Sequence, residues 1–213
     1  MKVYGDLIVR GDEKALKRFI VALEQRLTNG WSRYHEREAE VGRLALGSMY
    51  CFACKAQGSR PASELWLVTS SDGHLFVSNI LAREFSSLTY DQYNAIISDF
   101  YRTCAKPAAD SAQVSIELGN PDPQLEDFMP PATARLLRNF ASSANRSILH
   151  PLDRRRWNEF LTSAHREGAE LSADLLKRWL IEEANWPEDE AFSLAVEYEH
   201  ARDLLATYES RPA

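Results

Sequence analysis

Apolar residues near the start of the chain follow first the spacing of a strand and then that of a helix. Val3–Val9 is rich in Val, Ile, Leu and Tyr, which predicts a strand. Asp12 can cap a helix after it, and Asn29-Gly30 can end that helix in a left-handed conformation. Between them, apolar residues recur at intervals of three and four and form a single stripe: Leu16, Phe19, Ile20, Leu23 and Leu27.

The following segment predicts a series of strands. Met49–Lys55 is short and apolar, and Glu64–Thr69 is apolar on both alternating faces, which favours a central place in a sheet. Ser71–Gly73 predicts a turn, because glycine readily adopts a positive φ, and His74–Leu81 predicts the partner strand. Residues 31–41 mix aromatic and charged side chains and fit neither pattern.

A second helix and a last strand complete the first 120 residues. Thr89 and Gln92 have the spacing of a capping box at a helix start. The apolar stripe behind them consists of Tyr93, Ile96, Ile97, Phe100 and Cys104. Val114–Leu118 alternates between apolar and polar residues, as half-exposed strands do. An antiparallel sheet with two helices packed on it buries both stripes most simply, so we expect an α+β domain over residues 1–120.

Prolines mark the end of this domain. Gly119–Pro131 contains four prolines, which predicts a stiff connector over residues 121–131. Apolar residues then recur only at helical spacing, so we expect an all-helical C-terminal module over residues 132–213. On its last helix, the predicted inner face runs from Ala191 to Tyr208.

The composition fits a folded protein in a reducing compartment. The chain has 213 residues, of which 45% are hydrophobic and 26% charged. No apolar run approaches the length of about 18 residues that a membrane span needs, and we find no signal peptide at the N-terminus. Three cysteines in a chain without an export signal predict free thiols, so we expect a cytoplasmic protein.

Charge is distributed unevenly within the second half of the chain. The net formal charge is -6. The segment from Arg135 to Arg156 contains six arginines and one acidic residue, Asp153. The segment from Glu182 to Glu209 contains nine acidic residues and one arginine, Arg202. The basic stretch could bind phosphate or an acidic partner, or pair with the acidic last helix. Arg154, Arg155 and Arg156 are consecutive and fan out too widely on a helix for all three to face one ligand.

The motifs that most often carry chemistry are absent or fail on geometry. Cys51 and Cys54 have the spacing of a metal or redox motif, but residues three apart in a strand point to opposite faces of the sheet. No phosphate-binding or hydrolase signature occurs, and we expect no cofactor. Asp6 lies within a predicted strand and is a candidate metal carboxylate, although two converging partners would be needed.

We therefore expect a non-catalytic protein-binding or regulatory subunit, of an immunity or antitoxin type, in a bacterial-type cytosol. We expect its partner to be another protein with a basic surface. Nucleic acid is a less favoured partner, no membrane is expected, and a homo-oligomer stays open. The candidate binding residues are Arg154, Arg155, His150, Glu188, Glu197 and Glu199. The alternative is a metal-dependent enzyme that acts on nucleotides or nucleic acid, in which Asp6 would bind the metal and the Arg154 region the phosphate.

Overall fold

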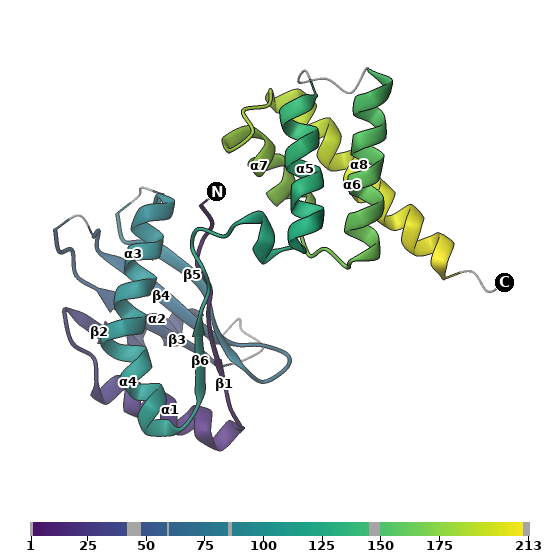
Figure 1. Cartoon of the computed structure of the whole chain (residues 1–213). Helices are drawn as coiled ribbons and strands as arrows, with labels where there is room; N and C mark the ends of the chain where they lie inside the picture. The colour runs from purple at the N-terminus through teal and green to yellow at the C-terminus, as the bar shows by residue number, and fades with distance from the viewer. Residues whose placement is uncertain (1, 42–47, 59, 85–86, 145–149, 211–213) are drawn as a thin grey trace. The chain divides into compact units, whose positions relative to one another are not determined.

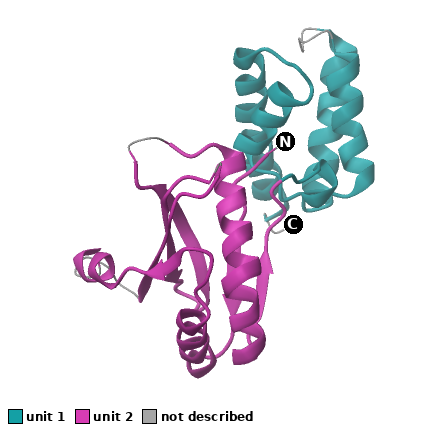
Figure 2. Ribbon diagram, turned by 90° about the vertical axis from the view of Figure 1, so that its left-hand side faces the viewer, with its two compact units in different colours: residues 1, 122–213 teal, residues 2–121 magenta. Residues whose placement is uncertain are grey.

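The chain forms two compact units, which are described separately below (Figure 2). The computed structural model describes residues 2–41, 48–58, 60–84, 87–144 and 150–210. One unit comprises Lys2–Pro121 and the other Asp122–Ala213. Among the described residues, no helix combines the length and the apolar character needed to cross a membrane.

The first unit is built on an antiparallel sheet of six strands (Figure 1). The strands are β1 (Leu7–Arg10), β2 (Trp31–Arg33), β3 (Met49–Cys54), β4 (Ser63–Thr69), β5 (Leu75–Ala82) and β6 (Ser115–Leu118). Their order across the sheet is β2-β3-β4-β5-β1-β6. The central position expected for the segment at Glu64–Thr69 is confirmed, because β4 pairs with β3 on one side and β5 on the other.

The first strand is shorter than its apolar pattern predicts, because the residues before it make other contacts. The backbone N–H of Val3 donates to the carbonyl of Pro121 at 2.9 Å, and that of Gly5 donates to Asn94 Oδ1 at 2.7 Å. Asn94 Nδ2 in turn donates to the carbonyl of Val3. With these groups satisfied outside the sheet, β1 begins only at Leu7 and Asp6 precedes it, so the prediction of Asp6 as a mid-strand residue was wrong.

Both predicted helix starts are confirmed. Helix α1 (Glu13–Gln25) is capped by Asp12, whose Oδ1 accepts from the N–H of Ala15 at 2.7 Å. Helix α3 (Tyr90–Phe100) starts with the capping box, in which Thr89 and Gln92 each accept from the other's backbone N–H.

Helix α3 continues through a wide turn into α4 (Lys106–Ala112). The turn, Tyr101–Ala105, is a π-helix. Pro107 follows directly, in the first turn of α4, where its missing N–H is tolerated. The widened turn thus lets one helical run pass a proline that would break an ordinary helix, and α4 then packs against α1.

One core fills the space between the helices and the sheet. Its members come from both helical stripes and from alternate positions of the strands, and the largest include Phe19, Leu23, Phe52, Leu65, Leu67, Ile96 and Phe100. Cys54 and Cys104 also belong to this core, whereas Cys51 lies opposite Trp66 on the other face of the sheet. The expected fold class, an antiparallel sheet with helices packed on it, is therefore confirmed.

A short helix, α2 (His35–Val41), lies in the segment whose pattern was ambiguous. It packs against β3, where β2 has ended at Arg33. The Glu38 side chain replaces the missing strand, since its Oε1 accepts from the N–H of Cys51 at 2.9 Å while both Glu38 oxygens pair with Arg33. Helix α2 thus contacts the edge of the sheet through polar side chains, which explains why its sequence has no apolar stripe.

The second unit is all helical, as the sequence predicts. Its elements are a 3-10 turn (Leu125–Asp127), α5 (Pro131–Ser143), α6 (Pro151–Arg166), α7 (Ala173–Glu182) and α8 (Glu188–Glu209). The centre is aromatic: the rings of Phe140, Trp157, Phe160, Trp186 and Tyr198 contact one another in series. Leu125 and Met129, from the proline-rich segment, are buried in the same core.

The end of α8 departs from the predicted pattern. Tyr198 is buried against Phe160, but Leu204 is 70% exposed and Tyr208 76% exposed. The helix has 22 residues and spans about 33 Å, longer than the 16-residue α6 beside it. Its last turns project from the bundle (Figure 1), so the prediction that the inner face continues to Tyr208 was wrong.

Candidate functional site

The structure spreads the predicted basic stretch over separate ion pairs. Arg154 pairs with Glu197 of α8, Arg155 with Glu159 at 3.1 Å, and Arg156 with Asp153 at 2.8 Å. Of the alternatives for this stretch, pairing with the acidic last helix is thus present in the structure, through Arg154.

Two of these arginines share a groove. Arg154 and Arg155 line a shallow hollow of about 730 Å³ along α6, together with Arg166, while Arg156 does not. The three consecutive arginines therefore do not all face one groove, as the sequence predicts. Arg154 and Arg155 already pair with carboxylates, so part of the positive charge of the groove is neutralised before a phosphate group binds.

His150 acts as the N-cap of α6. Its Nδ1 accepts from the N–H of Leu152 at 3.2 Å, and its side chain lies at the surface. The ring nitrogen thus satisfies a backbone N–H at the start of α6, and this structural role explains the position of His150 without a bound ligand.

The acidic candidates on α8 do not converge on one point. Glu188 pairs with Lys177 at 2.9 Å, which lowers the pKa of the Glu188 carboxyl. Glu197 is held by Arg154. Glu199 lines a different hollow of about 540 Å³, which Arg202 and His165 also line.

Asp6 lies at the surface, just before β1. Within the ranges that the structure describes, no three His, Cys, Asp or Glu side chains come close enough to hold a metal ion. Asp6 instead lies near Tyr93, whose pKa is raised to about 12, mainly by burial and to a smaller degree by the Asp6 charge.

The cysteines lie in protected environments. Cys51, Cys54 and Cys104 are all free and buried. Burial raises the pKa of Cys51 to about 12, and the nearby Glu64 carboxylate adds to the shift; burial also raises the pKa of Cys54. Both thiols are therefore held in the protonated form at neutral pH, which disfavours a role as nucleophiles.

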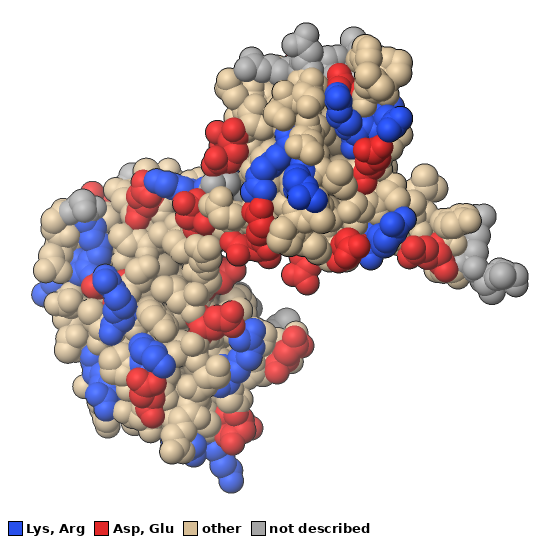
Figure 3. Space-filling model, in the orientation of Figure 1, with Lys and Arg blue, Asp and Glu red and all other residues tan. Residues whose placement is uncertain are grey.

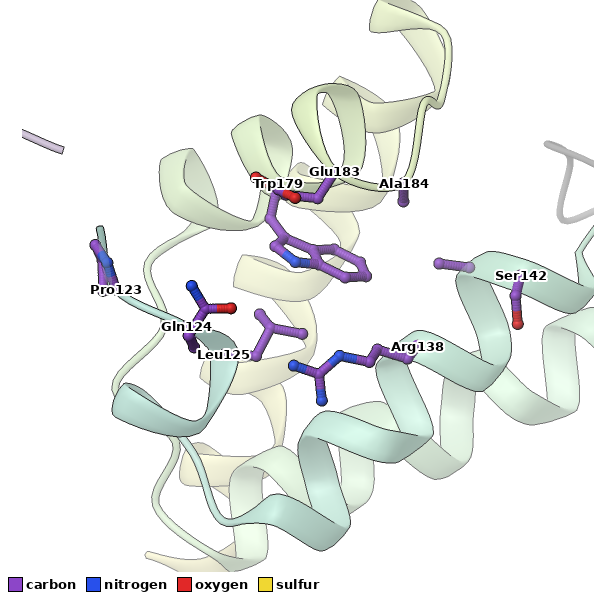
Figure 4. A pocket seen from close by; sticks show the side chains of 9 residues that line it. Pro123, Gln124, Leu125, Arg138, Ser142, Trp179, Glu183 and Ala184 are labelled. Atoms are coloured by element: carbon purple, nitrogen blue, oxygen red, sulfur yellow. The ribbon is translucent and has the colours of Figure 1, made fainter. Parts of the chain in front are cut away.

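The sequence did not reveal a cleft of about 420 Å³ between α5, α7 and the 3-10 turn (Figure 4). Leu125 and Ala141 lie at its base and are buried. The indole of Trp179 and the guanidinium of Arg138 face the hollow from α7 and α5 (Figure 4). Three tryptophans in so short a module were the available signal, because one left partly exposed marks a contact surface.

Arg138 is held in place at this cleft. Its two Nη nitrogens donate to the two carboxylate oxygens of Glu126, with Nη2 and Oε2 2.7 Å apart. The fork-to-fork pairing lowers the pKa of Glu126 to about 2. Glu126 belongs to the 3-10 turn, so the ion pair also fastens the proline-rich segment to α5.

The projecting end of α8, residues Ala201–Glu209, is called the α8 tip from here on. Ala201, Leu204, Leu205 and Tyr208 recur on it at intervals of three and four and form one apolar stripe. Ala201 and Leu205 are half-buried, whereas the two larger side chains are exposed.

Acidic side chains accompany this stripe. Asp203 and Glu209 belong to the tip, and Glu199 lies one turn before Asp203; Glu209 Oε2 pairs with His165 Nε2 of α6 at 3.0 Å. Figure 3 shows acidic, basic and uncharged surface along the projecting helix. The one arginine of the tip is engaged: Arg202 Nη1 donates to the carbonyl of Leu171 at 3.2 Å, and its guanidinium lies over the Tyr198 ring. The tip therefore presents apolar surface beside negative charge.

Comparisons of the chain with protein-family models, with curated proteins and with solved structures gave no match.

Proposed function

We propose that the protein is a non-catalytic protein-binding or regulatory subunit, of an immunity or antitoxin type, and that the α8 tip is its contact surface. The observation that carries this proposal is the exposure of Leu204 and Tyr208, 70% and 76%, on a helix that projects from its own bundle. Apolar side chains that form a stripe at helical spacing are typical of a helix that lies in the groove of another protein.

The charges beside the stripe indicate the chemistry of the partner. Glu199 and Asp203 are acidic, Glu209 already pairs with His165 at 3.0 Å, and the one arginine of the tip is engaged within the bundle. A complementary partner surface has an apolar groove with Lys or Arg at its rim. Of the acids predicted from sequence, Glu199 fits this role best, because Glu188 and Glu197 already pair with Lys177 and Arg154.

The exposed stripe is large enough to contribute measurably to affinity. Complete burial of a large apolar side chain contributes about 1.5–3 kcal/mol. Leu204 and Tyr208 have about three quarters of their surface left to bury, so together they would contribute about 2–4 kcal/mol. That range corresponds to a change of about 30- to 1,000-fold in Kd.

The experiment is a quantitative pull-down from the source cells with three tagged proteins: wild type, Leu204→Ser/Tyr208→Ser and Phe192→Ser. Phe192 is the matched control, since it lies exposed on the same helix but outside the tip. We expect one protein to be retained in stoichiometric amount by wild type and by Phe192→Ser, and lost from the double variant.

Two further arms define the nature of the partner. Glu199→Lys/Asp203→Lys should weaken retention of a basic partner, and sedimentation of the purified chain detects a second copy as the occupant. Equal retention by the wild type and the Leu204→Ser/Tyr208→Ser variant contradicts the proposed contact surface, and a monomeric chain that retains no protein contradicts the proposed function.

The alternative, a metal-dependent enzyme that acts on nucleotides or nucleic acid, stays a prediction. It depends on Asp6 and on the Arg154 region, and the described residues add no observation in favour of either role. Calorimetry with Mg²⁺ or Mn²⁺ tests it, because a metal site at Asp6 gives heat that Asp6→Asn removes.

A further inference from the structure

We infer that the cleft between α5, α7 and the 3-10 turn binds a flat aromatic ring, the side chain of a Phe, Tyr or Trp of the protein partner. The cleft is distinct from the α8 tip and contains none of its residues. The inference rests on the proposed function only for the source of the ring, because the chemistry of the cleft defines the ligand class.

The base of the cleft is apolar, and the wall at α7 carries the indole of Trp179 beside the Glu183 side chain. The buried residues Leu125 and Ala141 line the cleft, and Figure 4 shows the Trp179 indole close to Leu125. Trp179 is half-buried, whereas the other four tryptophans of the chain are buried. An indole left partly open above an apolar base offers a stacking surface, on which a second ring gains more than an aliphatic group of the same area.

The opposite wall supplies a cation with a free flat face. Glu126 occupies the edges of the Arg138 guanidinium, at its two Nη nitrogens, and so fixes the orientation of the group. The faces of a guanidinium stay available when its edges are bound, and they stack on aromatic rings. Figure 4 shows this group and the Trp179 indole on either side of the hollow.

The size and rim of the cleft fit one side chain with its peptide groups. A hollow of about 420 Å³ lies at the small end of the range for ligand pockets. Gln124 and Ser142 line the rim and carry amide and hydroxyl groups, which suit the peptide groups that flank a side chain. The arrangement thus selects a ring at the base and a backbone at the mouth.

The first test uses wild-type protein and two small neutral probes, N-acetyl-phenylalaninamide and, as matched control, N-acetyl-leucinamide. With excitation at the red edge of tryptophan absorption, acrylamide quenches chiefly Trp179, because the other tryptophans are buried. The phenylalanine probe should protect Trp179 from acrylamide in a saturable manner and the leucine probe should not. Equal protection by both probes, or protection by neither, overturns the inference.

The second test assigns the site by saturation-transfer NMR on the ring protons of the phenylalanine probe. Arg138→Ala should weaken binding about three- to tenfold, as expected for one lost cation–π contact. Arg135→Ala is the matched control, since Arg135 lies exposed on the same helix but does not line the cleft. Trp179→Leu should abolish saturable binding, and equal binding by the two arginine variants overturns the inference.

Neither test requires the protein partner or the α8 tip. Failure of the probe experiments therefore leaves the proposed function standing, and failure of the pull-down leaves the cleft as a site for an aromatic group from another source.

Discussion

Asp99, at the end of α3, joins three parts of the first unit through one buried oxygen, and its substitution should be costly. Asp99 Oδ2 accepts from Trp31 Nε1 at 2.9 Å and pairs with Arg60 from the loop between β3 and β4. The side chains of Arg60 and Asp99 are only 10% and 19% exposed. Asp99→Asn keeps the size of the side chain but leaves the buried Arg60 guanidinium without its counter-charge.

The expected cost is about 3 kcal/mol of unfolding free energy, the lower end of the range for a buried pair that loses one partner, because the site is not fully dehydrated. Arg60 Nη2 retains acceptors at the carbonyl of Asn29 and at Gln57, which also limits the loss. The double variant Arg60→Met/Asp99→Asn should be no less stable than Asp99→Asn alone, since the unpaired cation is then removed.

Hydrogen exchange in a urea series, read by mass spectrometry, measures the effect separately for Lys2–Pro121 and Asp122–Ala213. Only exchange in the first unit should respond to Asp99→Asn. The matched control is Asp110→Asn, which breaks the exposed pair with Lys106 on the same helical run and should change stability hardly at all. An Asp99→Asn protein as stable as the Asp110→Asn control would refute the reasoning.

Three further outcomes follow from burial. The thiols of Cys51, Cys54 and Cys104 should resist a disulfide reagent at pH 8 in the native protein and react once it is unfolded; a rapid native reaction would contradict their protected positions. The pKa of Tyr93 is about 12 in the folded protein and about 10 in the unfolded chain, so its contribution to stability should be complete below pH 10 and lost as the pH rises towards 12. Over this range the unfolding free energy of the wild type should fall by about 1–3 kcal/mol more than that of Tyr93→Phe, as measured by unfolding at a series of pH values. Tyr198→Phe should cost only about 1 kcal/mol in urea unfolding, because Arg202 still donates to the carbonyl of Leu171 that Tyr198 gives up; a loss above about 3 kcal/mol would show a larger role for the hydroxyl.

The sequence predicts the parts of the fold in which local and tertiary preferences agree. Asp12 and the Thr89–Gln92 pair cap their helices as expected, because a cap depends on residues within one turn. The opposite orientations of Cys51 and Cys54 follow from strand geometry alone. These features need no knowledge of distant contacts.

The errors concern positions where a distant contact decides the outcome. Val3 and Gly5 fit the pattern of a strand, yet their backbone N–H groups donate hydrogen bonds to Pro121 and Asn94, which lie far along the chain. Tyr208 has the correct helical spacing for an inner face, but its side chain is 76% exposed. Periodicity records which residues share a face and not whether another element covers that face.

The candidate sites show the same division. The sequence predicts Arg154 and Glu197 as binding residues and gives pairing of the basic stretch with the last helix as one alternative; in the structure the two side chains pair with each other. The cleft at Trp179 is formed by three segments that lie apart in the sequence, so its position could not be predicted. The number of tryptophans was the one sequence feature that indicated an exposed aromatic side chain.

The most direct test of the proposed function is a calorimetric titration of the isolated partner with wild-type protein, Leu204→Ser/Tyr208→Ser and Phe192→Ser. The substituted side chains are mostly exposed, so the unfolding midpoints of the three chains should differ by no more than about 4 °C. The account predicts a Kd that rises about 30- to 1,000-fold for the double variant and less than about threefold for Phe192→Ser. Equal Kd values for the double variant and the wild type would contradict the assignment of the α8 tip as the contact surface.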